Sequence, residues 1–103
     1  MSDKEENKLD MKWTETVPAK VRTLTREGCE KDQPFGRVEV EVLRSAVGFF
    51  HTTFFADHDA FQTAIDCFKN NESIEFKGDF VQTNNHVRTS HASDVRKAED
   101  DEE

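Results

Sequence analysis

Apolar and polar residues alternate along two stretches of the first half of the chain, residues 17–24 and residues 37–43. A period of two places one face of a strand on a core and leaves the other face polar. The pattern therefore predicts two half-buried strands, and the polar segment 27–36, which contains glycines and a proline, predicts a loop between them. Pro18 lacks an N–H, which favours an edge or entry position in the first strand.

The next stretch, residues 46–55, carries aromatic and β-branched residues on both parities. Such a run predicts a third strand whose two faces are both shielded, or one face of which awaits a ligand. Gly48 favours a bulge or a sharp bend in this strand. Alternation alone does not decide which of two sets faces outward: the set Phe49, His51 and Phe55, or the set Phe50, Thr52 and Phe54.

The period then changes to that of a helix over residues 58–70, where an apolar stripe is formed by Phe61, Ala64, Ile65 and Phe68. Asp57 or Asp59 can cap the helix N-terminus, and Asn70-Asn71 can end it through a left-handed residue. Alternation returns in residues 74–81, and the Asn84-Asn85 pair predicts a short turn into a last strand over 86–91. The predicted order is three strands, one helix and two strands.

Charge divides the 103-residue chain into three parts. The formal net charge of −8 falls mostly on the termini, because residues 1–11 carry −2 and residues 98–103 carry −5, while residues 12–97 carry 12 basic against 13 acidic side chains. We therefore expect one domain over residues 12–97 between two disordered acidic tails. The composition excludes a membrane-spanning helix and a strongly basic nucleic-acid arm, and the charged N-terminus predicts a cytoplasmic protein.

The order of elements resembles the OB-fold, a five-stranded Greek-key barrel found in single-strand DNA-binding proteins, tRNA-binding domains and cold-shock-like modules. The resemblance covers residues 17–95 and rests on element order and segment length, including the 74–81 strand, the Asn84-Asn85 turn and a return to Val95. It implies a mainly β domain of β-β-β-α-β-β order, in which the helix between strands three and four plugs one end of the barrel.

The OB-fold resemblance also implies a binding site. The family binds oligonucleotides or oligosaccharides on the outer face of strands two and three, flanked by the loops between strands one and two and strands four and five. Here those loops are residues 27–36 and 82–86. Aromatic side chains would stack on bases and cations would meet phosphates. The residues assigned to this nucleic-acid site are Arg22, Arg37, Arg44, Phe49, His51, Phe55, Lys77 and Arg88.

Two observations oppose a nucleic-acid ligand. Glu39 and Glu41 would lie on the same face and repel phosphates, and a nearly neutral domain gives little non-specific attraction. The alternatives are that the phenylalanines only pack the interior, or that the aromatic face or a sheet edge binds a protein partner or a second copy of this chain. The tail 98–103 is similar in charge to the acidic tails of single-strand DNA-binding proteins, but it ends on Glu103. A solvated tail is its simplest interpretation.

Catalytic chemistry has little support in the sequence. The four histidines lack metal-ligand spacing, and the motifs of nucleophilic or phosphate-binding sites are missing. We therefore expect no enzyme, no metal and no cofactor. Cys29 and Cys67 lack the density of a disulfide framework, so both are expected as free thiols, with Cys67 in the core. Trp13 is expected to anchor the N-terminal segment on the domain.

Overall fold

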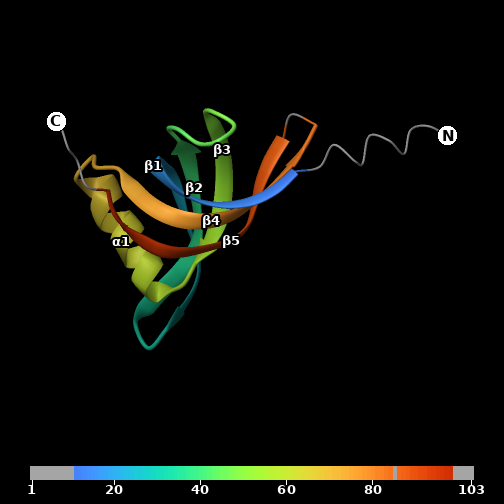
Figure 1. Ribbon diagram of the computed structural model, residues 1–103. Coiled ribbons are helices and arrows are strands. Elements are labelled where there is room, and N and C mark those ends of the chain that lie inside the picture. The colour runs from blue at the N-terminus through green and yellow to red at the C-terminus, as the bar shows by residue number, and fades with distance from the viewer. Residues whose placement is uncertain (1–10, 85, 99–103) are drawn as a thin grey trace.

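A computed structural model describes residues 11–84 and 86–98 of the chain. The elements are β1 (Met11–Glu30), β2 (Gln33–Val42), β3 (Phe50–Ala56), α1 (His58–Lys69), β4 (Ile74–Thr83) and β5 (His86–Lys97), shown in Figure 1. The predicted mainly β class and the position of the helix between strands three and four are confirmed. The acidic segments 1–10 and 99–103 lie outside the described residues, whereas Met11, expected in the tail, opens β1.

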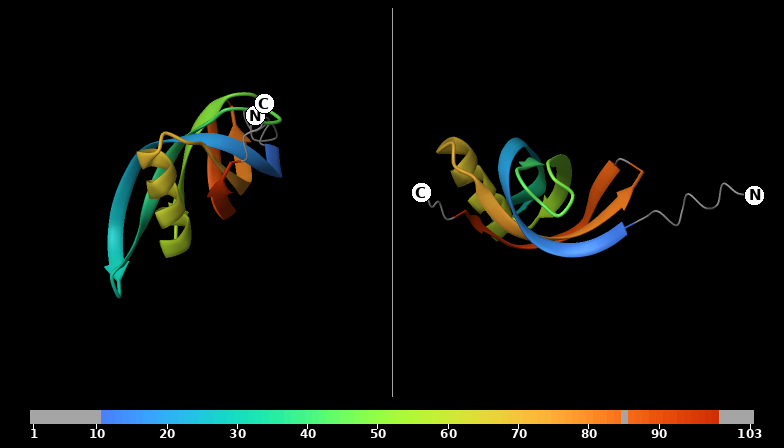
Figure 2. Two further views of the ribbon diagram at one scale, coloured as in Figure 1. Left: turned by 90° about the vertical axis from the view of Figure 1, so that its left-hand side faces the viewer. Right: turned by 45° about the horizontal axis from the view of Figure 1, so that its top comes forward.

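The five strands form one antiparallel sheet in the order β3-β2-β1-β4-β5. The long β1 pairs with β4 through Met11–Ala19 and with β2 through Ala19–Glu30, so it changes partner near its middle. Register shifts in β1 at Val21/Thr23 and Arg26/Gly28 accompany its bend, as bulges do in coiled sheets. The sheet curls into a small barrel-like shape (Figure 2) in which the hydroxyls of Thr52 and Thr89 join edge strands β3 and β5 at 2.7 Å.

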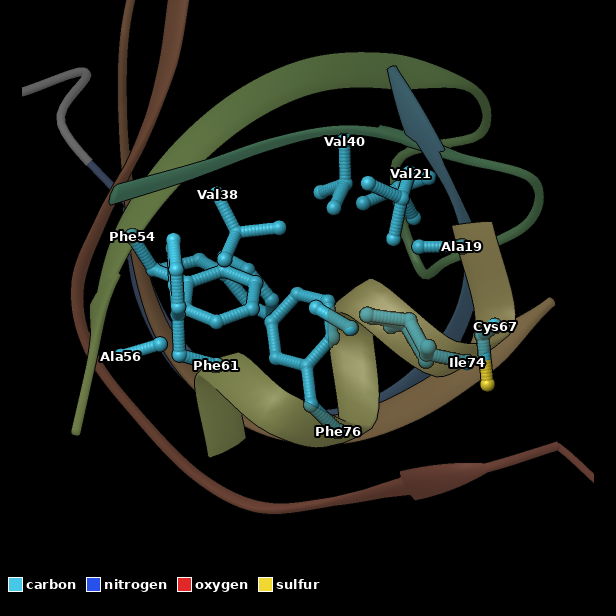
Figure 3. Close-up of a cluster of buried hydrophobic side chains, with 14 of the residues drawn as sticks. Ala19, Val21, Val38, Val40, Phe54, Ala56, Phe61, Cys67, Ile74 and Phe76 are labelled. Carbon is cyan, nitrogen blue, oxygen red and sulfur yellow. The ribbon is translucent and has the colours of Figure 1, made fainter. Parts of the chain in front are cut away.

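The core fills the inside of this curled sheet. Figure 3 shows side chains from the strands and from α1 pointing into one cluster. The valines of β2 alternate inward with outward charged residues, as their period of two predicts. The largest fully buried side chains are Phe76, Phe80, Ile74, Val17, Val38, Val40 and Val42. Burial of these side chains stabilises the curled sheet, since each contributes about 1.5–3 kcal/mol relative to exposure.

Helix α1 begins and ends as its sequence predicts. The Asp57 carboxylate accepts a hydrogen bond from the Ala60 backbone N–H at 3.0 Å, and Asn71 has the left-handed φ of 56° after the last turn. Cys67 is buried, as predicted, but the apolar stripe differs from the prediction, because Phe68 is 49% exposed and Ile65 is only partly buried. The helix packs with Phe61, Ala64 and Cys67 inward, a face rotated from the predicted Phe61/Ile65/Phe68 stripe.

The loop predicted over residues 27–36 is wrong. β1 continues to Glu30, and Lys31 and Asp32 alone turn the chain into β2, with φ of 54° and 65°. Positive φ at both central residues is the geometry of a type I′ hairpin turn, which Asn-Gly or Asp-Gly usually announces. Lys31-Asp32 adopts this turn without that sequence signal. The resulting hairpin projects from the body of the molecule (Figure 2).

Two further expectations about the strands are corrected. Pro18 lies in the central strand rather than at an edge, at a point where β2 has ended and the Pro18 carbonyl accepts a hydrogen bond from Leu43 N–H. Its missing N–H faces the same side, beyond the end of β2 at Val42. The third strand begins at Phe50 rather than at 46, and Gly48, with φ of 89°, belongs to the preceding turn.

Candidate ligand-binding face

Strand β3 directs one of its two parity sets outward, which settles the alternative that the sequence left open. Thr52 and Phe54 are buried, whereas Phe49, just before the strand, is 55% exposed and Phe55 is 51% exposed. His51 lies between them, with 59% of its side chain exposed. The outward set is therefore Phe49, His51 and Phe55, an aromatic row along the outer side of the sheet.

Each end of the row is a pair of aromatic rings. Phe49 and His51 meet edge to face, with centroids 5.3 Å apart and an interplanar angle of 88°. Phe55 meets Phe35 of β2, with centroids 5.9 Å apart and an angle of 58°. Sequence reasoning missed Phe35 because it placed this residue in a loop. The contact of Phe35 with Phe55 follows from the β2–β3 register, which pairs the adjacent Gly36 with Ala56 and which no local sequence pattern indicates. We name these four aromatic residues the aromatic face.

Strand β2 contributes charged residues beside the aromatic face. Its register places Glu41 opposite His51, Glu39 opposite Thr53 and Arg37 opposite Phe55. Cross-strand neighbours on one face of an antiparallel pair lie close enough for their side chains to interact. The surface is therefore amphipathic, with aromatic rings at both ends and charged groups between and beside them.

Two of the predicted phosphate-binding arginines form ion pairs with glutamates. The Arg22 guanidinium contacts one Glu41 carboxylate oxygen, and the other oxygen lies 3.8 Å from His51 Nε2. Arg37 Nε donates to Glu27 at 2.6 Å. These contacts offset the negative charge of the two glutamates, but they also reduce the attraction that Arg22 and Arg37 can offer to a phosphate. Stacking rather than charge is thus the main interaction that this face can make.

A groove of about 330 Å³ connects β3 to the beginning of β5. It brings the predicted residues His51 and Arg88 together and adds His86, which sequence reasoning counted only as part of a loop rim. Glu39 also lines the groove, with neutral groups completing it: Thr52, Thr53, Val87 and Thr89. A second pocket of about 300 Å³ adjoins the other end of the face and is lined by Glu30, Gln33, Phe35, Phe55, Asp57 and His58.

Two predicted site residues are not brought into this arrangement. Arg44 is exposed in the segment between β2 and β3, without a residue of the aromatic face as its strand partner. Lys77 is exposed on β4, opposite Thr16 of β1 and Ser93 of β5. Because β1 lies between β4 and β2 in the sheet, Lys77 is away from the β2–β3 ladder.

The two cysteines are free, as predicted, but their environments differ. Cys29 is exposed near the tip of the β1–β2 hairpin, whereas Cys67 is 3% exposed on the inner side of α1. Burial raises the pKa of the Cys67 thiol, and the nearby Glu72 carboxylate raises it further. Cys67 is therefore a core side chain, held as the neutral thiol.

Comparison of the chain with family models, curated proteins and solved structures finds no match. In the described part of the chain, no helix is both long enough and apolar enough to cross a membrane.

Proposed function

We propose that the chain is a non-catalytic module of the OB type that binds single-stranded DNA or RNA across its aromatic face. The OB assignment is supported by connectivity, since β1 pairs with both β2 and β4 and the helix lies between β3 and β4. It is also supported by the approach of β3 to β5 through a side-chain hydrogen bond, which resembles the partial closure of the OB barrel. The outer side of strands two and three is the surface on which such barrels bind oligonucleotides.

The observation that carries the proposal is the exposure of Phe49 and Phe55 on one side of β3, 55% and 51% respectively. Buried rings in this strand already supply the core, so packing does not account for the outward pair. A base can stack on an exposed aromatic ring with a contribution of about 1–3 kcal/mol, whichever base it is. The row therefore suits a flexible single strand with unpaired bases.

Electrostatics makes the binding modest and mainly dependent on stacking. Arg22 and Arg37 are engaged by glutamates, which leaves Arg88 as the arginine of the adjoining groove without a carboxylate partner among the described ion pairs. The salt slope of single-strand binding is about −0.7 per neutralised phosphate. We therefore expect a slope of roughly −0.7 at pH 8, corresponding to one phosphate.

The proposal is tested by titrating fluorescently labelled oligothymidine and oligouridine into the full chain at low salt. Saturable binding below about millimolar is expected, since single-strand binders tighten at low salt. A chain ending at Lys97 tests the acidic segment, whose removal is expected to strengthen binding if its carboxylates compete with phosphate. Absence of saturable binding to both oligomers, with the protein folded by circular dichroism, overturns the nucleic-acid proposal.

A second function, a contact with another protein or a second copy of this chain, is favoured by the two sheet edges, since β3 and β5 each have one strand neighbour in the described part of the chain. β3 and β5 are the end strands of the sheet, and a groove of about 560 Å³ lies between them near the N-terminus of α1. Unpaired strand edges offer backbone groups to an added strand. Analytical ultracentrifugation tests self-association: a concentration-dependent increase in mass supports it, and a constant monomer mass excludes it.

A further inference from the structure

The groove between β3 and β5 gathers three basic side chains from two strands. His51 comes from β3, while His86 and Arg88 lie at the beginning of β5. All three are exposed, so each can reach a ligand in the groove. The two strands approach each other at this point, because the Thr52 and Thr89 hydroxyls are hydrogen-bonded at 2.7 Å. The groove also touches the aromatic face through His51, the edge-to-face neighbour of Phe49.

The charge of this groove depends on its histidines. With both imidazoles neutral, Arg88 (+1) and Glu39 (−1) cancel, and the formal charge of the lining residues is zero. With both imidazoles protonated, the same residues carry +2. Histidine is the side chain whose ordinary titration falls between pH 5 and 8. Protonation of both imidazoles therefore converts the groove from formally neutral to cationic.

The charged groups of the neighbouring strands do not cancel this gain of positive charge. Besides Glu39, strand β2 brings the carboxylate of Glu41 near His51, and the Arg22 guanidinium of β1 neutralises that carboxylate. From β4 the partners of the two β5 residues are uncharged: Thr83 lies opposite His86, and Val81 lies opposite Arg88.

We propose that this groove is a phosphate subsite that holds a backbone phosphodiester of the single strand when His51 and His86 are protonated. The subsite rests on the proposed function, since it anchors the backbone of a strand whose bases stack on Phe49 and Phe55. A protonated imidazole donates N–H groups to a phosphate oxygen, and the Arg88 guanidinium offers a planar pair of donors. Affinity for nucleic acid therefore rises as the pH falls through the histidine range.

The test measures the affinity of labelled oligothymidine at pH 8 and pH 5.5, each at several salt concentrations. Thymine and the phosphodiester keep their charge over this interval, so the protein alone titrates. For the natural chain we expect binding about tenfold tighter at pH 5.5, with a salt slope steeper by about 0.7 for each added phosphate contact. The H51Q/H86Q variant is expected to lose most of this pH dependence.

Two further variants separate the groove from general charge effects. His91→Gln is the matched control, because His91 is an exposed histidine of the same strand that lines the other groove. We expect H91Q to keep the pH dependence of the natural chain. His86→Lys places a permanent charge in the groove, so we expect H86K to bind more tightly than the natural chain at pH 8.

The outcomes distinguish the two proposals. Oligothymidine binding that is equal at both pH values, or pH dependence that survives in H51Q/H86Q, overturns the phosphate subsite and leaves the proposed function standing. Equal loss of pH dependence in H91Q also overturns it. Absence of binding at either pH overturns the proposed function itself.

Discussion

The aromatic face makes a quantitative prediction for the variants Phe49→Ala and Phe55→Ala. Each substitution removes one stacking surface and is expected to cost about 1–3 kcal/mol of binding free energy, or about 5- to 150-fold in Kd. The two rings are six positions apart along an extended segment, which corresponds to about 20 Å at about 3.3 Å per residue. At that separation the effects should be nearly additive. The double variant is therefore expected to lose about 2–6 kcal/mol, at least about 30-fold in Kd.

The assay is fluorescence anisotropy with labelled oligothymidine at low salt, together with urea unfolding of every variant. Phe68→Ala is the matched control, because Phe68 is 49% exposed but lies on α1, away from the aromatic face. Stability should fall by only about 1 kcal/mol in F49A or F55A, since each loses one partly exposed aromatic pair. The reasoning is refuted if F68A weakens binding as much as F55A, or if F49A/F55A binds within twofold of the natural chain.

Four further predictions concern the fold that supports this face. Phe76→Ala should lower the free energy of unfolding by about 3–5 kcal/mol in urea titration, since Phe76 is fully buried. A loss below about 1 kcal/mol would contradict the placement of Phe76 in the core. Asp57→Ala should cost about 1 kcal/mol by removing the helix cap, and an unchanged urea midpoint contradicts that cap. A thiol reagent at pH 8 should label Cys29 rapidly and Cys67 only on unfolding. Burial raises the pKa of Cys67 above that of the unfolded thiol, which is about 8.5. The free energy of unfolding that the neutral thiol contributes is therefore fully present below about pH 8.5 and is lost as the pH rises through the folded-state pKa. Cys67→Ala should remove this loss, and urea midpoints at pH 8 and 9.5 measure it.

Local sequence patterns predicted the strands and the helix whose formation depends on residues close together in the chain. The β2 valines at alternate positions gave a strand with one buried face, and the spacing from Phe61 with the cap at Asp57 gave the helix. Both depend only on neighbours along the chain. The Lys31-Asp32 turn was missed because its residues lack the Gly or Asn preference for positive φ, so tertiary pairing of β1 with β2 overrides local preference.

The candidate site was predicted only in part, for a different reason. Phe49, His51 and Phe55 were proposed as one of two possible sets, because both parities of β3 are apolar and only the curl of the sheet decides which is inside. The contribution of Phe35 depends on the β2–β3 register, and that of His86 on the approach of β5 to β3. Such contacts join residues far apart in the chain, which periodicity does not report.

The measurement that tests the account most directly is a heteronuclear NMR titration of the labelled full chain with oligothymidine. We expect saturable shifts concentrated on Phe49 and on β3 as far as Phe55, and on Arg37 and Arg88, with the outer side of α1 around Phe68 unchanged. Shifts confined to α1, or a spectrum that does not respond to saturating oligothymidine at low salt, would contradict the assignment of the aromatic face as a nucleic-acid surface.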